Sequence, residues 1–295
     1  MNRGVLYALI AYVMWGLFPI YWKWLHPVPA LEILCHRMAW SMLFVLILLF
    51  WKKTAIRTLL RREPQTLSIF LLTASLLSVN WGLYIWAVNT QRVVDASLGY
   101  FINPLVNVLL GVIILKEKLQ PGHWLAVGLA AAGVLYLALQ QAGLPWIALV
   151  LAFSFALYGL LRKTAPLNSL EGLAIETTLL LPLALAYLVT LERGGMGHFG
   201  HGAPQITLLL ALAGPVTALP LLFFAAGARR IPYSQIGFLQ YVAPTMQFLI
   251  GVFLFHEPFS KTRLTGFALV WMALAIYAGV EWGTKRRVAL AAPLE

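Results

Sequence analysis

The chain has 295 residues, of which 61% are hydrophobic and only 11% are charged. An ordinary soluble domain has about 25% charged residues, so this composition excludes a soluble fold and indicates an integral membrane protein. The net charge of +11 would suit a nucleic-acid-binding protein, but the cations gather in one set of connecting segments, which indicates membrane orientation instead.

Ten apolar segments follow one another along the chain, each close to the roughly 17–25 residues that cross a bilayer. The first is longer than the apolar region of a signal peptide and has no small-residue cleavage site after it, so we expect it to be retained. The connections are too short to fold as soluble domains, which predicts an all-α membrane protein. The predicted spans are 4–22, 32–51, 66–88, 94–115, 122–140, 144–161, 171–191, 205–226, 232–255 and 264–282.

The positive charges predict the direction in which the chain crosses the membrane. Most of the 21 Lys and Arg residues lie in segments on the same side as the N-terminus, and such an excess marks the cytoplasmic side. Both termini are therefore expected in the cytoplasm. The inner cations are Arg3, Lys52, Lys53, Arg57, Arg61, Arg62, Lys116, Lys118, Arg162, Lys163, Arg229, Arg230, Lys285, Arg286 and Arg287, and the outer ones are Lys23, Arg92, Arg193, Lys261 and Arg263.

The two halves of the chain resemble each other at an offset of 140 residues. NPLVNVLLGVIILKEKL (103–119) aligns with APTMQFLIGVFLFHEPF (243–259), and ALIAYVMWGL (8–17) aligns with ALVLAFSFAL (148–157). Five spans in each half place the second half upside down, the inverted repeat of many secondary transporters. We therefore expect two five-helix repeats, 1–142 and 143–295, within one membrane domain. The matched pairs include Pro104 with Pro244, Gly111 with Gly251, and Glu117 with Glu257.

The fourth and ninth spans carry equivalent polar stripes beside a proline. Each proline leaves the carbonyl four residues before it without its helical partner, and such a carbonyl must face protein or a wet cavity. We expect the two stripes to face each other across a central solute pathway. The alternative for the two asparagines is that their amides only join helices. The stripes are Tyr100, Asn103, Pro104, Asn107 and Gly111 in the fourth span, and Gln240, Pro244, Gln247 and Gly251 in the ninth.

A second candidate surface lies in NWGLYIWAVN (80–89) of the third span. Asn80, Trp81 and Tyr84 share one side of the helix and could form an aromatic floor for an organic solute. Aromatic residues near span ends also anchor helices at the membrane interface, and this is the interpretation we favour for Trp86.

Ionisable residues inside membrane spans are functional candidates by default, and among those in the predicted spans Arg37 and Glu176 stand out. Arg37 and Glu176 occupy equivalent places in the two halves, but the inverted topology puts them near opposite surfaces, about 14 Å apart in depth in a core of ~30 Å. We expect Arg37 to line an outer vestibule and Glu176 an inner one, and proton coupling, if present, to involve Glu176. Snorkelling of both side chains to the headgroups is the alternative.

Glu117 and Glu257 end equivalent spans. We expect each to have a structural role, in which its carboxylate turns the chain and interacts with the positive N-terminal end of the following helix.

No residue pattern predicts a metal, a cofactor or catalysis. Cys35 is a single cysteine, expected to be a packing residue, and His198 and His201 lie in a glycine-rich connection that reads as a flexible loop without a third ligand. Zinc-protease, nucleophile-elbow and phosphate-loop motifs are missing from the sequence, which argues against an enzyme or an ATP-driven pump. A non-transporting structural or regulatory membrane protein stays open as the alternative.

Several segments resemble the RarD-type proteins of the EamA-like branch of the drug/metabolite transporter superfamily. They are GVLYALIAYVMWGLFPIYWK, NWGLYIWAVN followed by DASLGYFINPLVNVLLG, and GFLQYVAPTMQFLIGV. The resemblance implies ten helices in two inverted halves, an inner-membrane location, and movement of small organic molecules. Asp95 departs from the family pattern, where we expect Glu. The expected partners are a small organic solute and the lipid bilayer, with no nucleic acid; a monomer is compatible with the sequence.

Overall fold

The computed structural model describes residues 2–90, 92–140, 144–256 and 261–291. These ranges contain helices and no strand, and ten helical segments are long and apolar enough to cross a membrane, as the sequence predicts. The helices are α1 (Arg3–Trp24), α2 (Ala30–Trp51), α3 (Ile56–Leu60), α4 (Pro64–Asn89), α5 (Val93–Ile113), α6 (Pro121–Leu139), α7 (Trp146–Thr164), α8 (Ser169–Arg193), α9 (Pro204–Ala228), α10 (Tyr233–Gln240), α11 (Val242–Leu249), the π-helix η1 (Ile250–Leu254) and α12 (Lys261–Ala291).

Local sequence explains where several helices begin. α6 and α9 each start at a proline, which has no N–H to satisfy in the first turn. α8 starts with a capping box, in which the Asn168 side chain accepts from the backbone of Leu170 and Glu171 while the Glu171 carboxylate accepts from the Asn168 N–H.

The fourth and ninth spans, which carry the equivalent prolines Pro104 and Pro244, differ in the continuity of their helices. The ninth span is divided at Tyr241 into α10 and α11 and ends in η1, whereas α5 runs as one helix through Pro104. The Tyr241 hydroxyl donates to the carbonyl of Phe101, which lies 3.2 Å away and three residues before Pro104. A buried side chain thus supplies a hydrogen bond at the level where the proline weakens the helix.

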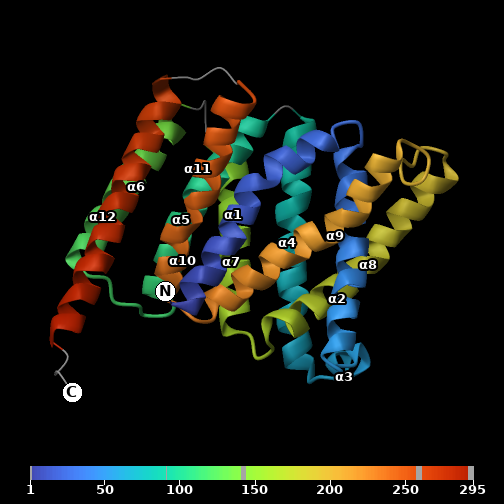
Figure 1. Cartoon of the computed structure of the whole chain (residues 1–295), viewed down its shortest axis with the longest axis horizontal. Coiled ribbons are helices and arrows are strands. Elements are labelled where there is room, and N and C mark those ends of the chain that lie inside the picture. Colours follow the sequence, from blue (N-terminus) through green and yellow to red (C-terminus); the bar gives the residue numbers. More distant parts are fainter. Residues whose placement is uncertain (1, 91, 141–143, 257–260, 292–295) are drawn as a thin grey trace.

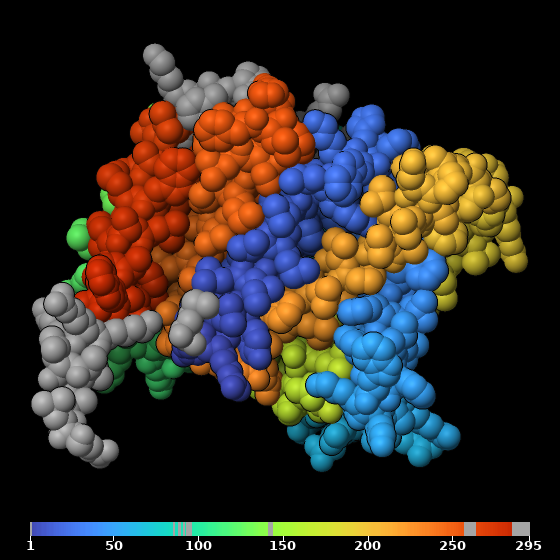
Figure 2. All heavy atoms as spheres, viewed as in Figure 1, coloured from blue at the N-terminus to red at the C-terminus, as the bar shows by residue number. Residues whose placement is uncertain are grey.

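The helices of the first half pack mainly on helices of the second half. α1 packs against α9 and α11, and Figures 1 and 2 show it lying between them. α2 packs on α8 and α9, α4 on α7 and α8, α5 on α7 and α10, and α6 on α12. α1 begins and α12 ends at the same end of the bundle, which we call the terminal end (Figure 1).

The largest buried cluster fills the bundle toward the terminal end. Tyr12, Tyr158, Phe224 and Tyr233 are almost fully buried in it, and the rings of Tyr158 and Phe224 stack with centroids 6.3 Å apart. The Tyr233 hydroxyl donates to the Ala156 carbonyl at 2.6 Å, so its polar atom is satisfied inside the core.

Candidate functional site

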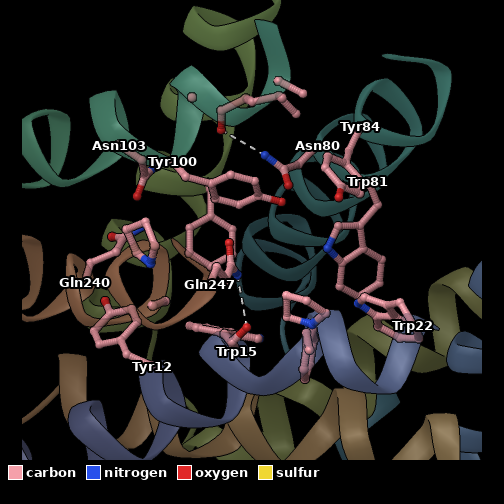
Figure 3. Close-up of a pocket in the computed structure, with 18 of the residues that line it drawn as sticks. Tyr12, Trp15, Trp22, Asn80, Trp81, Tyr84, Tyr100, Asn103, Gln240 and Gln247 are labelled. Carbon is pink, nitrogen blue, oxygen red and sulfur yellow. Dashed lines mark hydrogen bonds between the residues drawn. The ribbon is translucent and has the colours of Figure 1, made fainter. Parts of the chain in front are cut away.

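A cavity of about 190 Å³ lies between helices of both halves (Figure 3). Its walls come from α1, α2, α4 and α5 and from α7, α9, α10 and α11. The lining includes Trp22 near the last turn of α1 and Ala96 in the first turn of α5, so the cavity extends toward the end opposite the terminal end. The buried aromatic cluster lies on its other side.

Aromatic residues make up eight of the 21 residues that line the cavity. Trp22 of α1 and Trp81 of α4 converge at one side, while Tyr84 and Tyr100 lie near each other with ring centroids 6.1 Å apart (Figure 3). Flat apolar faces of this kind suit the body of an organic molecule. The aromatic lining residues are Tyr12, Trp15, Phe18, Trp22, Trp81, Tyr84, Tyr100 and Phe155.

Two amides have their orientation fixed by backbone carbonyls. The Asn80 Nδ2 group donates to the carbonyl of Leu151 at 2.8 Å and to Ser154 Oγ at 2.9 Å, and Gln247 Nε2 donates to the carbonyl of Trp15 at 3.1 Å. A carbonyl can only accept, so the nitrogen of each amide must be the atom that faces it. The amide oxygens of Asn80 and Gln247 are thereby left for the cavity that both residues line.

The stripes of α5 and α10 meet directly at a chain of three amides. Asn107 Nδ2 donates to Gln240 Oε1 at 2.6 Å and to Asn103 Oδ1 at 3.3 Å, and Asn103 donates to the carbonyl of Ala152 at 2.5 Å. Asn103 and Gln240 line the cavity, but Asn107 is fully buried behind them. In this conformation Asn107 joins the two stripes and does not face the cavity.

Arg37 is the one charged side chain among the described lining residues. Its Nε donates to Thr217 Oγ1 at 2.9 Å, and its guanidinium carbon lies 4.9 Å from the ring centre of Trp22 and 4.8 Å from that of Trp81. Thr217 lies in the middle of α9, so the side chain reaches inward and does not snorkel to the membrane surface in this conformation.

Glu176 lies outside this cavity and has a partner of its own. Its Oε1 is 3.7 Å from Arg162 Nε, and its Oε2 accepts from the Tyr158 hydroxyl at 3.4 Å. A void of only about 10 Å³ beside it shares Trp81 and Thr217 with the cavity wall. Arg37 and Glu176 do not contact each other, so these two charges occupy separate environments.

The chain matches a sequence profile of the EamA-like transporter family over residues 2–139. It is 47% identical to an uncharacterized transporter of Pseudomonas aeruginosa, over 98% of this chain and 97% of the relative. It is 44% identical to protein RarD of Escherichia coli, over 97% of each chain. The chain belongs to the EamA-like transporter family, among its RarD-type members. A crystal structure with 16% sequence identity has the same fold, with a TM-score of 0.71 over 93% of this chain and 97% of the other.

Membership of this family supports a multi-pass membrane transporter. Of the ten predicted pathway residues, the structure brings eight to one cavity, namely Arg37, Asn80, Trp81, Tyr84, Tyr100, Asn103, Gln240 and Gln247, and leaves Asn107 and Glu176 outside it. Pro244 also lines the cavity, while Gly111 and Gly251 are buried. The side chain of Asp95 and all of Glu257 lie outside the described residues.

Sequence reasoning missed the contribution of α1. Tyr12, Trp15, Phe18, Pro19 and Trp22 all line the cavity. Their spacing of three or four residues places them on one face of a helix, and this periodicity was a usable signal. Aromatic residues in a first span are equally typical of lipid-facing or interfacial positions, so this pattern alone does not assign them to a cavity.

Two expectations outside the cavity need correction. The Glu117 carboxylate does not cap the following helix α6; it accepts from the N–H groups of Tyr233 and Ser234, at 2.5 and 2.8 Å, and so caps α10 of the other half. The connection around His198 is anchored rather than free, because Glu32 accepts from both the backbone N–H and the ring of His198, at 2.7 and 2.8 Å. In both cases the partner is more than a hundred residues away in sequence.

Proposed function

We propose that this protein is a secondary transporter of the cell inner membrane that moves small organic solutes by alternating access through the cavity between its two halves. The main support for this proposal is the cavity and the residues that line it. Polar groups inside a membrane bundle are costly in free energy unless they join helices or line a solute path. Here Arg37, Asn80 and Gln247 line the same cavity. Aromatic rings around them supply the apolar surface that an organic solute needs.

The helix contacts support two equivalent repeats, 1–142 and 143–295. The contacts are preserved when each helix is exchanged for its counterpart in the other repeat. When α1, α2, α4, α5 and α6 are replaced by α7, α8, α9, α10–α11 and α12, the contact α1–α9 becomes α7–α4 and α2–α9 becomes α8–α4, and both of these exist. The contacts α2–α8, α5–α10 and α6–α12 map onto themselves. Two equivalent arrangements of such repeats give alternating access.

Matching backbone turns support the same repeat. Lys116 and His256, 140 residues apart, have left-handed φ angles of 54° and 53°. Just before them, the Leu115 N–H donates to the Leu110 carbonyl and the Phe255 N–H to the Ile250 carbonyl, the same five-residue spacing in both halves.

The proposed transport cycle assigns different roles to the two ends of the bundle. With the termini in the cytoplasm, as the positive charges predict, the cavity approaches the outer side. The buried cluster around Tyr158, Phe224 and Tyr233 then closes the inner side. Solute release inward requires this cluster to separate, together with the adjacent ion pair of Arg162 and Glu176.

Uptake of labelled small organic solutes into proteoliposomes tests the function. We expect flux above that of protein-free liposomes, and a strong loss of flux in Trp81→Ala, which removes a cavity wall. Trp124→Ala is the matched control, because Trp124 is 52% exposed and lies outside the cavity. If a broad panel of solutes gives no protein-dependent flux in either direction, the structural or regulatory alternative is favoured.

A further inference from the structure

Arg37 has no counter-ion within the described part of the protein. No described carboxylate lies within ion-pair distance of its guanidinium, whereas Arg162 and Glu176, which are both buried within spans, pair with each other. A guanidinium has five N–H donors, and one of them, at Nε, donates to Thr217. No hydrogen bond from the two terminal nitrogens to a described residue is present, so their donors are left for a ligand.

The surroundings hold this guanidinium in a fixed orientation. Trp22 and Trp81 contact it at nearly equal distances, and Thr217 fixes its Nε edge. Cation–π contacts stabilise the charge without using its hydrogen-bond donors. A planar guanidinium held in this way presents its donors as a rigid fork, which can form two parallel hydrogen bonds to one carboxylate.

We propose that the cavity binds the carboxylate of a small organic acid at Arg37, with the flat apolar body of the acid between the rings of α1, α4 and α5. This inference rests on the proposed transport function and assigns its substrate class. The described lining carries a single positive charge, so an organic cation would meet repulsion and a neutral analogue would leave the fork unpaired.

The cavity size limits the body of this acid. Its volume of about 190 Å³ is slightly larger than an engineered cavity of about 150 Å³ that binds benzene. One aromatic ring with a short carboxylate arm fits this space, whereas a ligand of drug size needs about 300 Å³ or more. Tyr84 and Tyr100 add hydroxyl groups within the same wall.

Binding to the purified full-length protein in detergent tests the charge class directly. The probes are benzoate, phenylacetate and 3-phenylpropionate, each compared with its amide and with the amine of equal length, by calorimetry and thermal shift. We expect at least one acid to bind, and its amide and amine to bind at least tenfold more weakly. Failure of all three acids at millimolar concentration, or equal binding of the matched amide or amine, would overturn the proposal.

Variants then assign the carboxylate to Arg37. Arg37→Gln should weaken binding of the acid at least tenfold, and Arg37→Lys, which keeps the charge but loses the fork, should have an intermediate affinity. Arg92→Gln should leave binding unchanged, because Arg92 lies over Trp86 outside the cavity. Wild-type affinity in a folded Arg37→Gln variant would contradict the assignment, and the Lys variant provides the readout if the Gln variant does not fold.

Flux measurements separate this inference from the proposed function. Acids that bind through Arg37 but never cross proteoliposome membranes would contradict transport and leave the binding site intact. Flux of neutral or cationic solutes that is insensitive to Arg37→Gln would support transport and overturn the substrate class.

Discussion

Arg162 of α7 and Glu176 of α8 form an ion pair inside the bundle, with each side chain only 1% exposed and with Nε and Oε1 3.7 Å apart. This separation is too long for a hydrogen bond, and Arg162 Nε and Nη1 and Glu176 Oε1 have no hydrogen-bond partner among the described residues. Arg162 Nη2 donates to the carbonyl of Ser169 at 2.7 Å. A buried pair with several unsatisfied atoms contributes little net stability, but removal of one partner leaves a bare charge in the core.

The first prediction concerns this pair. Glu176→Gln and Arg162→Met should each destabilise the protein by about 3–5 kcal/mol, because each leaves an uncompensated polar or charged group in the core. The double variant Arg162→Met with Glu176→Leu should recover most of the lost stability, since neither charge remains. Thermal unfolding in detergent measures both effects. Single variants that unfold at the wild-type temperature would contradict the energetic role of the pair.

Glu117 should stabilise the contact between the two halves. Its carboxylate accepts from two backbone N–H groups at the start of α10 and from the Ser234 hydroxyl at 2.7 Å. Glu117→Gln should cost about 1.5–3 kcal/mol of stability, the range for hydrogen bonds to a charged group, with little change in solute affinity. Ser234→Ala, which removes one of the three bonds, should cost less. A loss of affinity with unchanged stability would instead place Glu117 in the binding machinery.

Close packing of α10 on α5 should depend on Gly237. A Cβ atom at this position would lie 2.4 Å from the carbonyl oxygen of Pro104 and 3.2 Å from Asn107 Cβ. Gly237→Ala should therefore separate the two helices, lower the unfolding temperature and disturb the hydrogen bond of Asn107 to Gln240. Gly82→Ala is the control, because apart from its own stretch of helix no described residue has an atom within 4 Å of the added Cβ. If both variants unfold at the same temperature, α10 can shift away from α5 without loss of stability.

Cysteine accessibility should distinguish the cavity from the packing behind it. In a background lacking the buried Cys35, a cysteine at position 247 should react with small aqueous thiol reagents, because Gln247 lines the cavity. A cysteine at position 107 should react far more slowly, since Asn107 is fully buried. The opposite order would mean that the solute path runs between α5 and α10.

The sequence alone determined the ten spans and their character as helices. Hydrocarbon offers no partner to a backbone N–H or carbonyl, so a long apolar segment that crosses it forms a helix whatever its neighbours are. Helical periodicity also identified the polar stripes that include Tyr100, Asn103, Gln240 and Gln247, because residues three or four apart share a face.

The tertiary structure decided which partner each face meets. Periodicity places Asn107 and Asn103 on the same side of α5, but only the approach of α10 makes Asn107 a buried link to Gln240. Glu117 caps a helix 116 residues away, and Glu176 pairs with Arg162 across the connection between α7 and α8. The contacts of Asn107 and Glu117 depend on how helices of the two halves pack, whereas Arg162 and Glu176 lie on neighbouring helices of the second half. A pattern within one helix does not specify any of these neighbours, because the bilayer favours every apolar helix alike and the fit of side chains selects the neighbour.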